Sequence, residues 1–130
     1  MSRENVVAEF HKAFDHPISG EWTPFLLTLR SVLIGEECVE LQEEFYTLRH
    51  TDPTGWTREQ KAALLKEMAD LQYVLSGAAV ALGLNLEEAF IRVHKSNMSK
   101  LGEDGKPIRR EDGKILKGPH YKEPNLEDLV

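Results

Sequence analysis

Residues 23–49 read TPFLLTLRSVLIGEECVELQEEFYTLR, and this stretch decides the fold. Thr23 and Pro24 form a strong helix start, with Thr as the N-cap residue and Pro at the first helical position. Apolar residues then recur at helical spacing until residues 51–55, which contain Asp, Pro and Gly, interrupt the pattern. The stretch therefore predicts one long amphipathic helix that runs to about Arg49.

Three more helices are expected within the first 101 residues. They cover about residues 3–15, with Ser2 as the N-cap residue, 58–82 and 86–100. Thr57 with Gln60 three residues later resembles a capping box, and Gly83 is a suitable C-terminal stop. Asn85 with Glu88 repeats the start signal for the last helix. The fold class predicted is all-α, a helical bundle of four to five helices.

The character of the sequence changes after Leu101, where Gly and Pro punctuate a short basic stretch. Asp112-Gly113 favours a tight type I′ turn, which makes a small hairpin possible. An isolated two-stranded hairpin is only marginally stable. We therefore expect residues 102–130 to form an irregular, ordered tail that needs something to lie on. The whole chain, 1–130, is expected to be one domain with a helical body over about residues 1–101.

The charge is unevenly distributed along the 130 residues. The net charge is −6, which argues against a general nucleic-acid-binding role. Residues 1–99 carry −6, residues 100–122 carry +3 and residues 123–130 carry −3. An acidic body followed by a basic segment suggests that the negatively and positively charged residues face each other across a ligand.

The sequence favours a cytoplasmic protein that makes no membrane contact. Cys38 is the only cysteine, which excludes an internal disulfide and suits a reducing compartment. The longest apolar stretch, residues 74–84, is too short to span a bilayer. The first residues lack the apolar core of a signal peptide.

Four carboxylates lie on the apolar side of two expected helices. Glu37 points along the middle of the apolar stripe of its helix and Glu40 lies at the edge of that stripe. Glu67 and Asp70 repeat this arrangement on the next helix. Buried, unpaired carboxylates cost several kcal/mol, and a hard divalent cation is their usual compensation. The pattern indicates Mg²⁺ or Mn²⁺.

Zinc and di-iron centres fit these acids less well. No His or Cys lies at ligand spacing, which argues against zinc, and the Glu-x-x-His tetrad of di-iron bundles is absent. A solvated acidic face remains the simple interpretation for Glu43 and Glu44. On the last helix, Asn97 and Lys100 lie one turn apart on an apolar side, where they could hold a phosphate or simply end the helix.

These residues resemble a known superfamily, the all-α nucleoside triphosphate pyrophosphohydrolases with the MazG-like fold. Glu-x-x-Glu at 37–40 followed by Glu-x-x-Asp at 67–70 resembles their signature. The strings at 33–41, 67–74, 96–101 and 110–118 are similar to the branch that contains phosphoribosyl-ATP pyrophosphohydrolase and MazG-like enzymes. The resemblance covers roughly residues 25–122 and also extends to the dimeric dUTPases.

The resemblance implies Mg²⁺-dependent cleavage between the α- and β-phosphates of a nucleoside triphosphate, which releases the monophosphate and pyrophosphate. It implies Glu37, Glu40, Glu67 and Asp70 as metal ligands, with Mn²⁺ able to substitute. It implies Glu36 and Glu37 as catalytic residues, with the Glu36 carboxylate orienting or deprotonating the attacking water. The implied phosphate-binding residues are Asn97, Lys100, Lys114, Lys117 and Tyr121.

Three functions stay open at this point. One is an NTP or dNTP pyrophosphohydrolase, with dUTP among the candidate substrates. Another is phosphoribosyl-ATP pyrophosphohydrolase of histidine synthesis, which shares the metal chemistry but binds a second phosphoribosyl group. The last is a non-catalytic helical scaffold or nucleotide-binding protein. The resemblance also implies a homodimer or homotetramer, in which helices of two subunits form each site.

Overall fold

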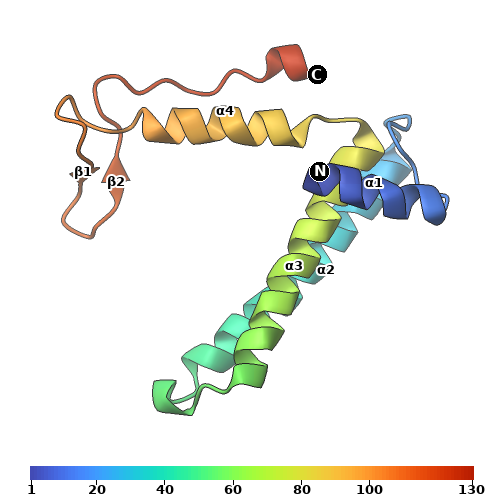
Figure 1. Cartoon of the computed structure of the whole chain (residues 1–130), viewed down its shortest axis with the longest axis horizontal. Helices are drawn as coiled ribbons and strands as arrows, with labels where there is room; N and C mark the ends of the chain where they lie inside the picture. The colour runs from blue at the N-terminus through green and yellow to red at the C-terminus, as the bar shows by residue number, and fades with distance from the viewer. The chain divides into compact units, whose positions relative to one another are not determined.

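The computed structural model describes residues 1–130 and confirms a mostly helical protein (Figure 1). The helices are α1 (Arg3–Ala13), α2 (Pro24–Arg49), α3 (Arg58–Leu82) and α4 (Leu86–Met98), with short 3₁₀ turns η1 (Pro53–Gly55) and η2 (Glu127–Leu129). The strands are β1 (Ile108–Arg109) and β2 (Ile115–Leu116). The chain contains two compact units, Met1–Leu84 and Asn85–Val130. The expectation of a single domain over 1–130 stays a prediction.

The helix boundaries follow from local capping chemistry. A backbone N–H of the first helical turn donates to the side chain of each predicted N-cap residue, namely Ser2, Thr23, Thr57 and Asn85. The capping box at the start of α3 is complete, and α3 ends at Gly83 with a left-handed φ of 70°. α4 ends at Met98 rather than near residue 100, because N–H groups of Ser99 and Lys100 bond to carbonyls three residues back.

The first unit is a helical hairpin with α1 added to one side. α2 and α3 run antiparallel and side by side, joined through η1, and α1 packs on α3 (Figure 1). The link between α1 and α2 is fastened to the end of α3, where Ser19 and Gly20 donate N–H groups to the carbonyls of Val80 and Ala81 at 2.8 and 2.7 Å. This arrangement brings the inward faces of α2 and α3 together over most of their length.

The buried interior of the first unit is small and unusually polar. Its buried apolar residues are Val7, Leu26, Ala79, Val80 and Ala81. His11, Arg30 and Ser76 are buried among them, with 2%, 6% and 0% of their surface exposed. The Nδ1 atom of His11 donates to the carbonyl oxygen of Pro17 at 2.7 Å, because a carbonyl oxygen can only accept. Burial lowers the pKa of His11. Many large apolar side chains remain exposed on α1, α2 and α3.

The second unit consists of α4, the hairpin and the end of the chain. Ser96 anchors the tail because its hydroxyl donates to the Lys122 carbonyl at 2.7 Å. Arg92 donates to the Asn125 carbonyl and to both carboxylate oxygens of Asp128. The last residues therefore run back along α4, and these contacts give the tail a surface to lie on.

The hairpin exists, but its turn differs from the expected type I′. β1 and β2 pair antiparallel, with Ile108 opposite Leu116. Only Gly113 in the turn has a positive φ, of 86°, and Asp112 does not, whereas a type I′ turn needs a positive φ at both central residues. Asp112 instead accepts the Lys114 N–H, and the Gly113 N–H bonds to the Arg110 carbonyl, so Asp112 stays in an unstrained conformation.

No single helix of the chain is long and apolar enough to cross a membrane.

Candidate metal centre

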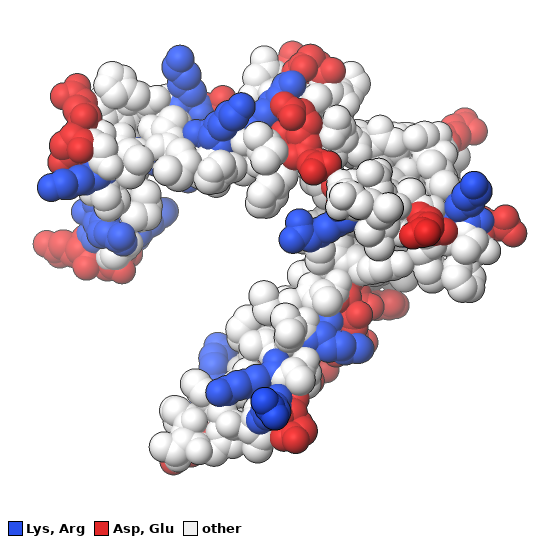
Figure 2. Space-filling view, viewed as in Figure 1, with Lys and Arg blue, Asp and Glu red and all other residues white.

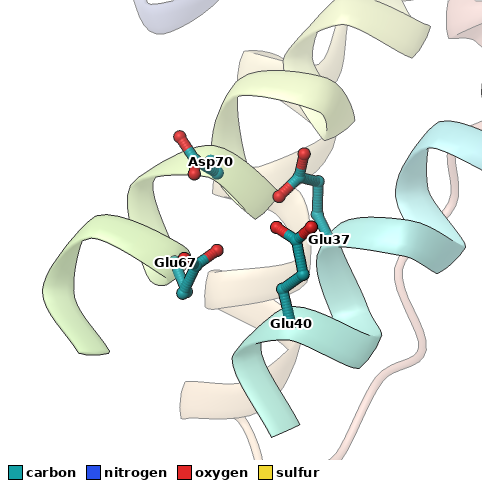
Figure 3. Close-up of side chains that lie close together, drawn as sticks. All are labelled: Glu37, Glu40, Glu67 and Asp70. Atoms are coloured by element: carbon teal, nitrogen blue, oxygen red, sulfur yellow. The ribbon is translucent and has the colours of Figure 1, made fainter. Parts of the chain in front are cut away.

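Four carboxylates from α2 and α3 converge in the first unit. One oxygen from each of Glu37, Glu40, Glu67 and Asp70 can be chosen so that all four lie within 4.8 Å of one another. The i, i+3 spacing places both acids of a helix on one face, one turn apart. Because α2 and α3 are antiparallel neighbours, the two faces meet, and Figure 3 shows the four acidic side chains close together between the two helices. The helical-wheel prediction of inward acids is thereby confirmed.

The cluster is electrostatically costly without a cation. Glu37, Glu67 and Asp70 are half-buried and Glu40 is exposed. The Oε2 atoms of Glu37 and Glu67 are shielded from solvent and have no hydrogen-bond partner. Burial is the first cause that raises the pKa of Glu37, and the neighbouring carboxyl of Glu40 is the second. The negative charges of Asp70 and Glu67 raise it further.

Lys66 lies at the rim of the cluster and was not anticipated from the sequence. Its Nζ atom lies 2.8 Å from Oδ2 of Asp70 and 3.4 Å from Oε1 of Glu67. These carboxylates raise the pKa of Lys66, so the ammonium stays charged at neutral pH. Its side chain is 66% exposed, which leaves it free to move away when another cation arrives. The i, i+4 spacing of Lys66 and Asp70 was the available sequence signal.

The donor set suits Mg²⁺. Four carboxylates provide only hard oxygen ligands, which Mg²⁺ and Mn²⁺ prefer. Oxygens bound to one Mg²⁺ at about 2.1 Å lie at most about 4.2 Å apart. The separation of up to 4.8 Å in the cluster is close to that limit, so side-chain shifts of a few tenths of an ångström would close it. Two orphaned buried oxygens are the atoms that such an ion would satisfy.

Glu36 lies next to the cluster in sequence but not within the group of four. Its side chain is exposed, one residue before the half-buried Glu37. Since consecutive helical residues point about 100° apart, Glu36 and Glu37 cannot both face α3 directly. This position leaves Glu36 available to water rather than committed to the acidic group.

The five predicted phosphate-binding residues all belong to the second unit. They are Asn97, Lys100, Lys114, Lys117 and Tyr121. Within that unit, Lys117 lies over the ring of Tyr121, with Nζ 4.7 Å from the centroid. Asn97 is exposed at the end of α4.

Basic and acidic side chains lie together on the β1–β2 hairpin (Figure 2). Arg110 is paired with Asp112, so its guanidinium already has an acidic partner within the segment. Lys114 and Lys117 are exposed and form no ion pair with an acidic residue of the chain.

Two further polar residues were not predicted from the sequence. Arg30 precedes Glu37 by seven residues, which places it on the same inward stripe, and this periodicity was the signal that could have found it. Ser96 is buried and holds the tail, whereas its neighbour Asn97, which the sequence placed on the apolar side, is exposed. A single serine on a helix carries no such signal, because its partner is a backbone carbonyl 26 residues away.

A helical hairpin with two acidic pairs facing each other fits the all-α architecture that the sequence predicts. Residues 7–97 match the family described as phosphoribosyl-ATP pyrophosphohydrolase. The chain belongs to this family, whose members hydrolyse a phosphoanhydride bond and are in general Mg²⁺-dependent. The match includes Glu36, all four acids of the cluster and Asn97, and it ends before the remaining phosphate-binding candidates. A search of curated proteins found no match.

Proposed function

We propose that this chain hydrolyses a nucleoside triphosphate or deoxynucleoside triphosphate between its α- and β-phosphates. The observation that carries the proposal is the convergence of four carboxylates within 4.8 Å, two of them with orphaned buried oxygens, in a member of a pyrophosphohydrolase family. Water adds to phosphorus, the bridging P–O bond breaks, and the products are the monophosphate and pyrophosphate. We include dUTP among the candidate substrates.

The acidic group holds the catalytic cation in this proposal. Glu37, Glu40, Glu67 and Asp70 provide the oxygen ligands, and two helices keep them in place before the substrate arrives. Bound Mg²⁺ supplies charge neutralisation of phosphate oxygens and lowers the pKa of water. Lys66 neutralises part of the cluster in the absence of metal and leaves Glu67 and Asp70 when metal binds.

Glu36 orients the attacking water and accepts its proton. Its exposed carboxylate lies beside the acidic group on α2 and has no ion-pair partner in the chain. A general base must reach the water while the metal ligands remain committed to the cation. Glu37, as a ligand, then acts on the reaction through the metal, and Glu36 acts on the water.

The phosphates need positive charge as well as metal. We assign this role to Asn97, Lys100, Lys114, Lys117 and Tyr121 in the second unit. Support comes from their order at the end of α4 and in the tail, and from the two exposed lysines that lack acidic partners. We expect the tail to fold over a metal site, of its own or a neighbouring subunit, and to order further when triphosphate binds.

The alternative substrate is phosphoribosyl-ATP, and it fits the family equally well. The metal chemistry is the same, because both substrates present an α–β phosphoanhydride bond. A non-catalytic nucleotide-binding or scaffold protein is the remaining alternative. The exposed apolar side chains of α1, α2 and α3 support self-association into a dimer or tetramer. We also expect a cytoplasmic protein without nucleic-acid or membrane partners.

The test is a panel of canonical NTPs and dNTPs together with phosphoribosyl-ATP, each with Mg²⁺ or Mn²⁺. We expect stoichiometric monophosphate and pyrophosphate from at least one nucleoside triphosphate, at higher kcat/KM than from phosphoribosyl-ATP. The reverse preference would assign the chain to histidine synthesis. Binding without pyrophosphate release would identify a scaffold or sensor.

Matched substitutions on α3 link the activity to the acidic group. Glu67→Gln should lose most turnover, because an amide is a poor ligand for a hard cation. Glu59→Gln is the control, since Glu59 is exposed in the first turn of the same helix and lies outside the group. On α2, Glu36→Gln should lower kcat and leave the Mg²⁺-dependent stabilisation intact.

A further inference from the structure

Lys66 is the basic side chain that the acidic group holds at its rim. Its Nζ atom lies 2.8 Å from Oδ2 of Asp70 and 3.4 Å from Oε1 of Glu67. The other ion pairs of the chain are made by Arg92 and Arg110, and none of them includes a residue of the acidic group. Because the side chain of Lys66 is mostly exposed, it can turn away without disturbing the packing of α3. Lys66 is therefore a positive charge that touches the site and can still move.

Lys66 lies on the same side of the acidic group as Glu36. Lys66 precedes Glu67 on α3 by about 100° of helical rotation, and Glu36 precedes Glu37 on α2 by the same angle. Two facing helices that run antiparallel turn such positions toward the same side of the pair, whereas parallel helices would turn them toward opposite sides. Since α2 and α3 run antiparallel (Figure 1), the exposed side chains of Glu36 and Lys66 flank one side of the group, each on its own helix.

This placement suits an in-line displacement at phosphorus. The attacking and leaving oxygens of such a reaction lie on opposite sides of the phosphorus atom. In the proposed function Glu36 orients the attacking water from α2, so the leaving oxygen points toward α3. Negative charge develops on that oxygen, and a cation held beside it stabilises the transition state. Lys66 is the cation that α3 carries at this position.

We propose that Lys66 is a further catalytic residue, which exchanges Asp70 and Glu67 for the pyrophosphate leaving group when the carboxylates hold their metal ion. The inference rests on the proposed pyrophosphohydrolase function. The oxygen of water bonds to the α-phosphorus and its proton passes to Glu36. The bond from this phosphorus to the bridging oxygen breaks, and its electron pair stays on the pyrophosphate. The ammonium of Lys66 donates a hydrogen bond to that oxygen and keeps its own protons.

The short distances explain why the exchange occurs. An ion bound to Oδ2 of Asp70 at about 2.1 Å would lie within about 5 Å of the present Nζ position, because this oxygen is 2.8 Å from Nζ. Two cations so close repel each other, and they compete for the same carboxylate oxygens. The backbone of Lys66 stays fixed on α3, one residue from Glu67. The released ammonium therefore remains within reach of the phosphates of a substrate bound at the acidic group.

Lys66→Gln separates this role from simple competition with the metal. We expect kcat to fall about ten- to hundredfold, the effect of losing one charge-assisted hydrogen bond, although Mg²⁺ binds more tightly to the variant. A side chain that only competes with Mg²⁺ would leave kcat unchanged when it is removed. Lys66→Arg should recover part of kcat because it keeps the charge. Lys61→Gln is the matched control, since Lys61 is exposed on the same helix and forms no ion pair.

Product binding gives a readout that does not depend on turnover. In calorimetric titrations with Mg²⁺ present, Lys66→Gln should bind pyrophosphate about tenfold more weakly than the unchanged chain and bind the monophosphate product equally well. Circular dichroism verifies that each variant is folded. An unchanged kcat for Lys66→Gln, or equal weakening of both products, would overturn the role of Lys66 while the proposed function stands. An unchanged chain that hydrolyses neither a nucleoside triphosphate nor phosphoribosyl-ATP would overturn both.

Discussion

Substituting Glu37 by Gln should stabilise the metal-free protein and abolish its response to Mg²⁺. Glu37 has one solvent-shielded carboxylate oxygen without a partner and three acidic neighbours. Gln has nearly the same shape and no charge, and its amide can donate to a neighbouring carboxylate. The substitution thus removes repulsion from the apo state and a ligand from the metal-bound state.

The magnitude follows from the geometry of the cluster. Two unit charges 4.8 Å apart repel by about 0.9 kcal/mol in water and by about 3.5 kcal/mol at an effective dielectric constant of about 20. The lower figure suits the pair with Glu40, which is exposed and screened. Burial, and then the neighbouring carboxylates, raise the pKa of Glu37, which agrees with an unfavourable charge at this position. We therefore expect Glu37→Gln to raise the free energy of unfolding by about 1–2 kcal/mol without metal.

Thermal unfolding in EDTA and in Mg²⁺ measures both effects. About 1–2 kcal/mol corresponds to a rise in Tm of about 3–8 °C for a chain of this size. The unchanged protein should gain about 2.7 kcal/mol when Mg²⁺ is at about 100 times its Kd. Glu36→Gln is the control, because this exposed neighbour lies outside the acidic group and should change neither value.

Two results would refute this reasoning. A lower Tm for Glu37→Gln in EDTA would mean that the carboxylate stabilises the apo fold through contacts that the cluster does not contain. An equal Mg²⁺-induced shift in Glu37→Gln and the unchanged protein would mean that the metal binds elsewhere.

Three further predictions use other parts of the chain. Burial, and then the charge of Arg30, lowers the pKa of His11 below 6.5. As the pH falls, the unfolded chain therefore binds a proton at His11 before the folded chain does, and the folded state loses stability. The urea midpoint should decrease when the pH is lowered from 7 to 5, and it should decrease less in His11→Gln. Lys66→Gln should reduce the Mg²⁺ concentration for half of the maximal Tm shift, since a competing cation is removed. Lys114→Gln with Lys117→Gln should raise KM or lower kcat by more than about tenfold at unchanged Tm, whereas a solvated tail would change the kinetics by less than about twofold.

The sequence determined the local structure because local chemistry decides it. Helix ends depend on hydrogen bonds between residues two to four positions apart, so the N-caps at Ser2, Thr23, Thr57 and Asn85 could be identified without tertiary information. The inward direction of Glu37 and Glu67 followed from helical periodicity in the same way. The turn at Asp112-Gly113 was located correctly, but its type was wrong, because side-chain and backbone bonds to Asp112 and Arg110 selected another conformation.

Only the tertiary structure decided which distant groups meet. Periodicity places an acidic pair on each helix, but the antiparallel pairing of α2 with α3 brings carboxylate oxygens of Glu37 and Glu67 within 4.8 Å of each other. The burial of Arg30 and the anchoring of the tail by Ser96 likewise depend on neighbours far away in the sequence. Helix caps act within one turn, whereas burial and charge clustering are properties of packed surfaces, and a surface exists only once the helices are side by side.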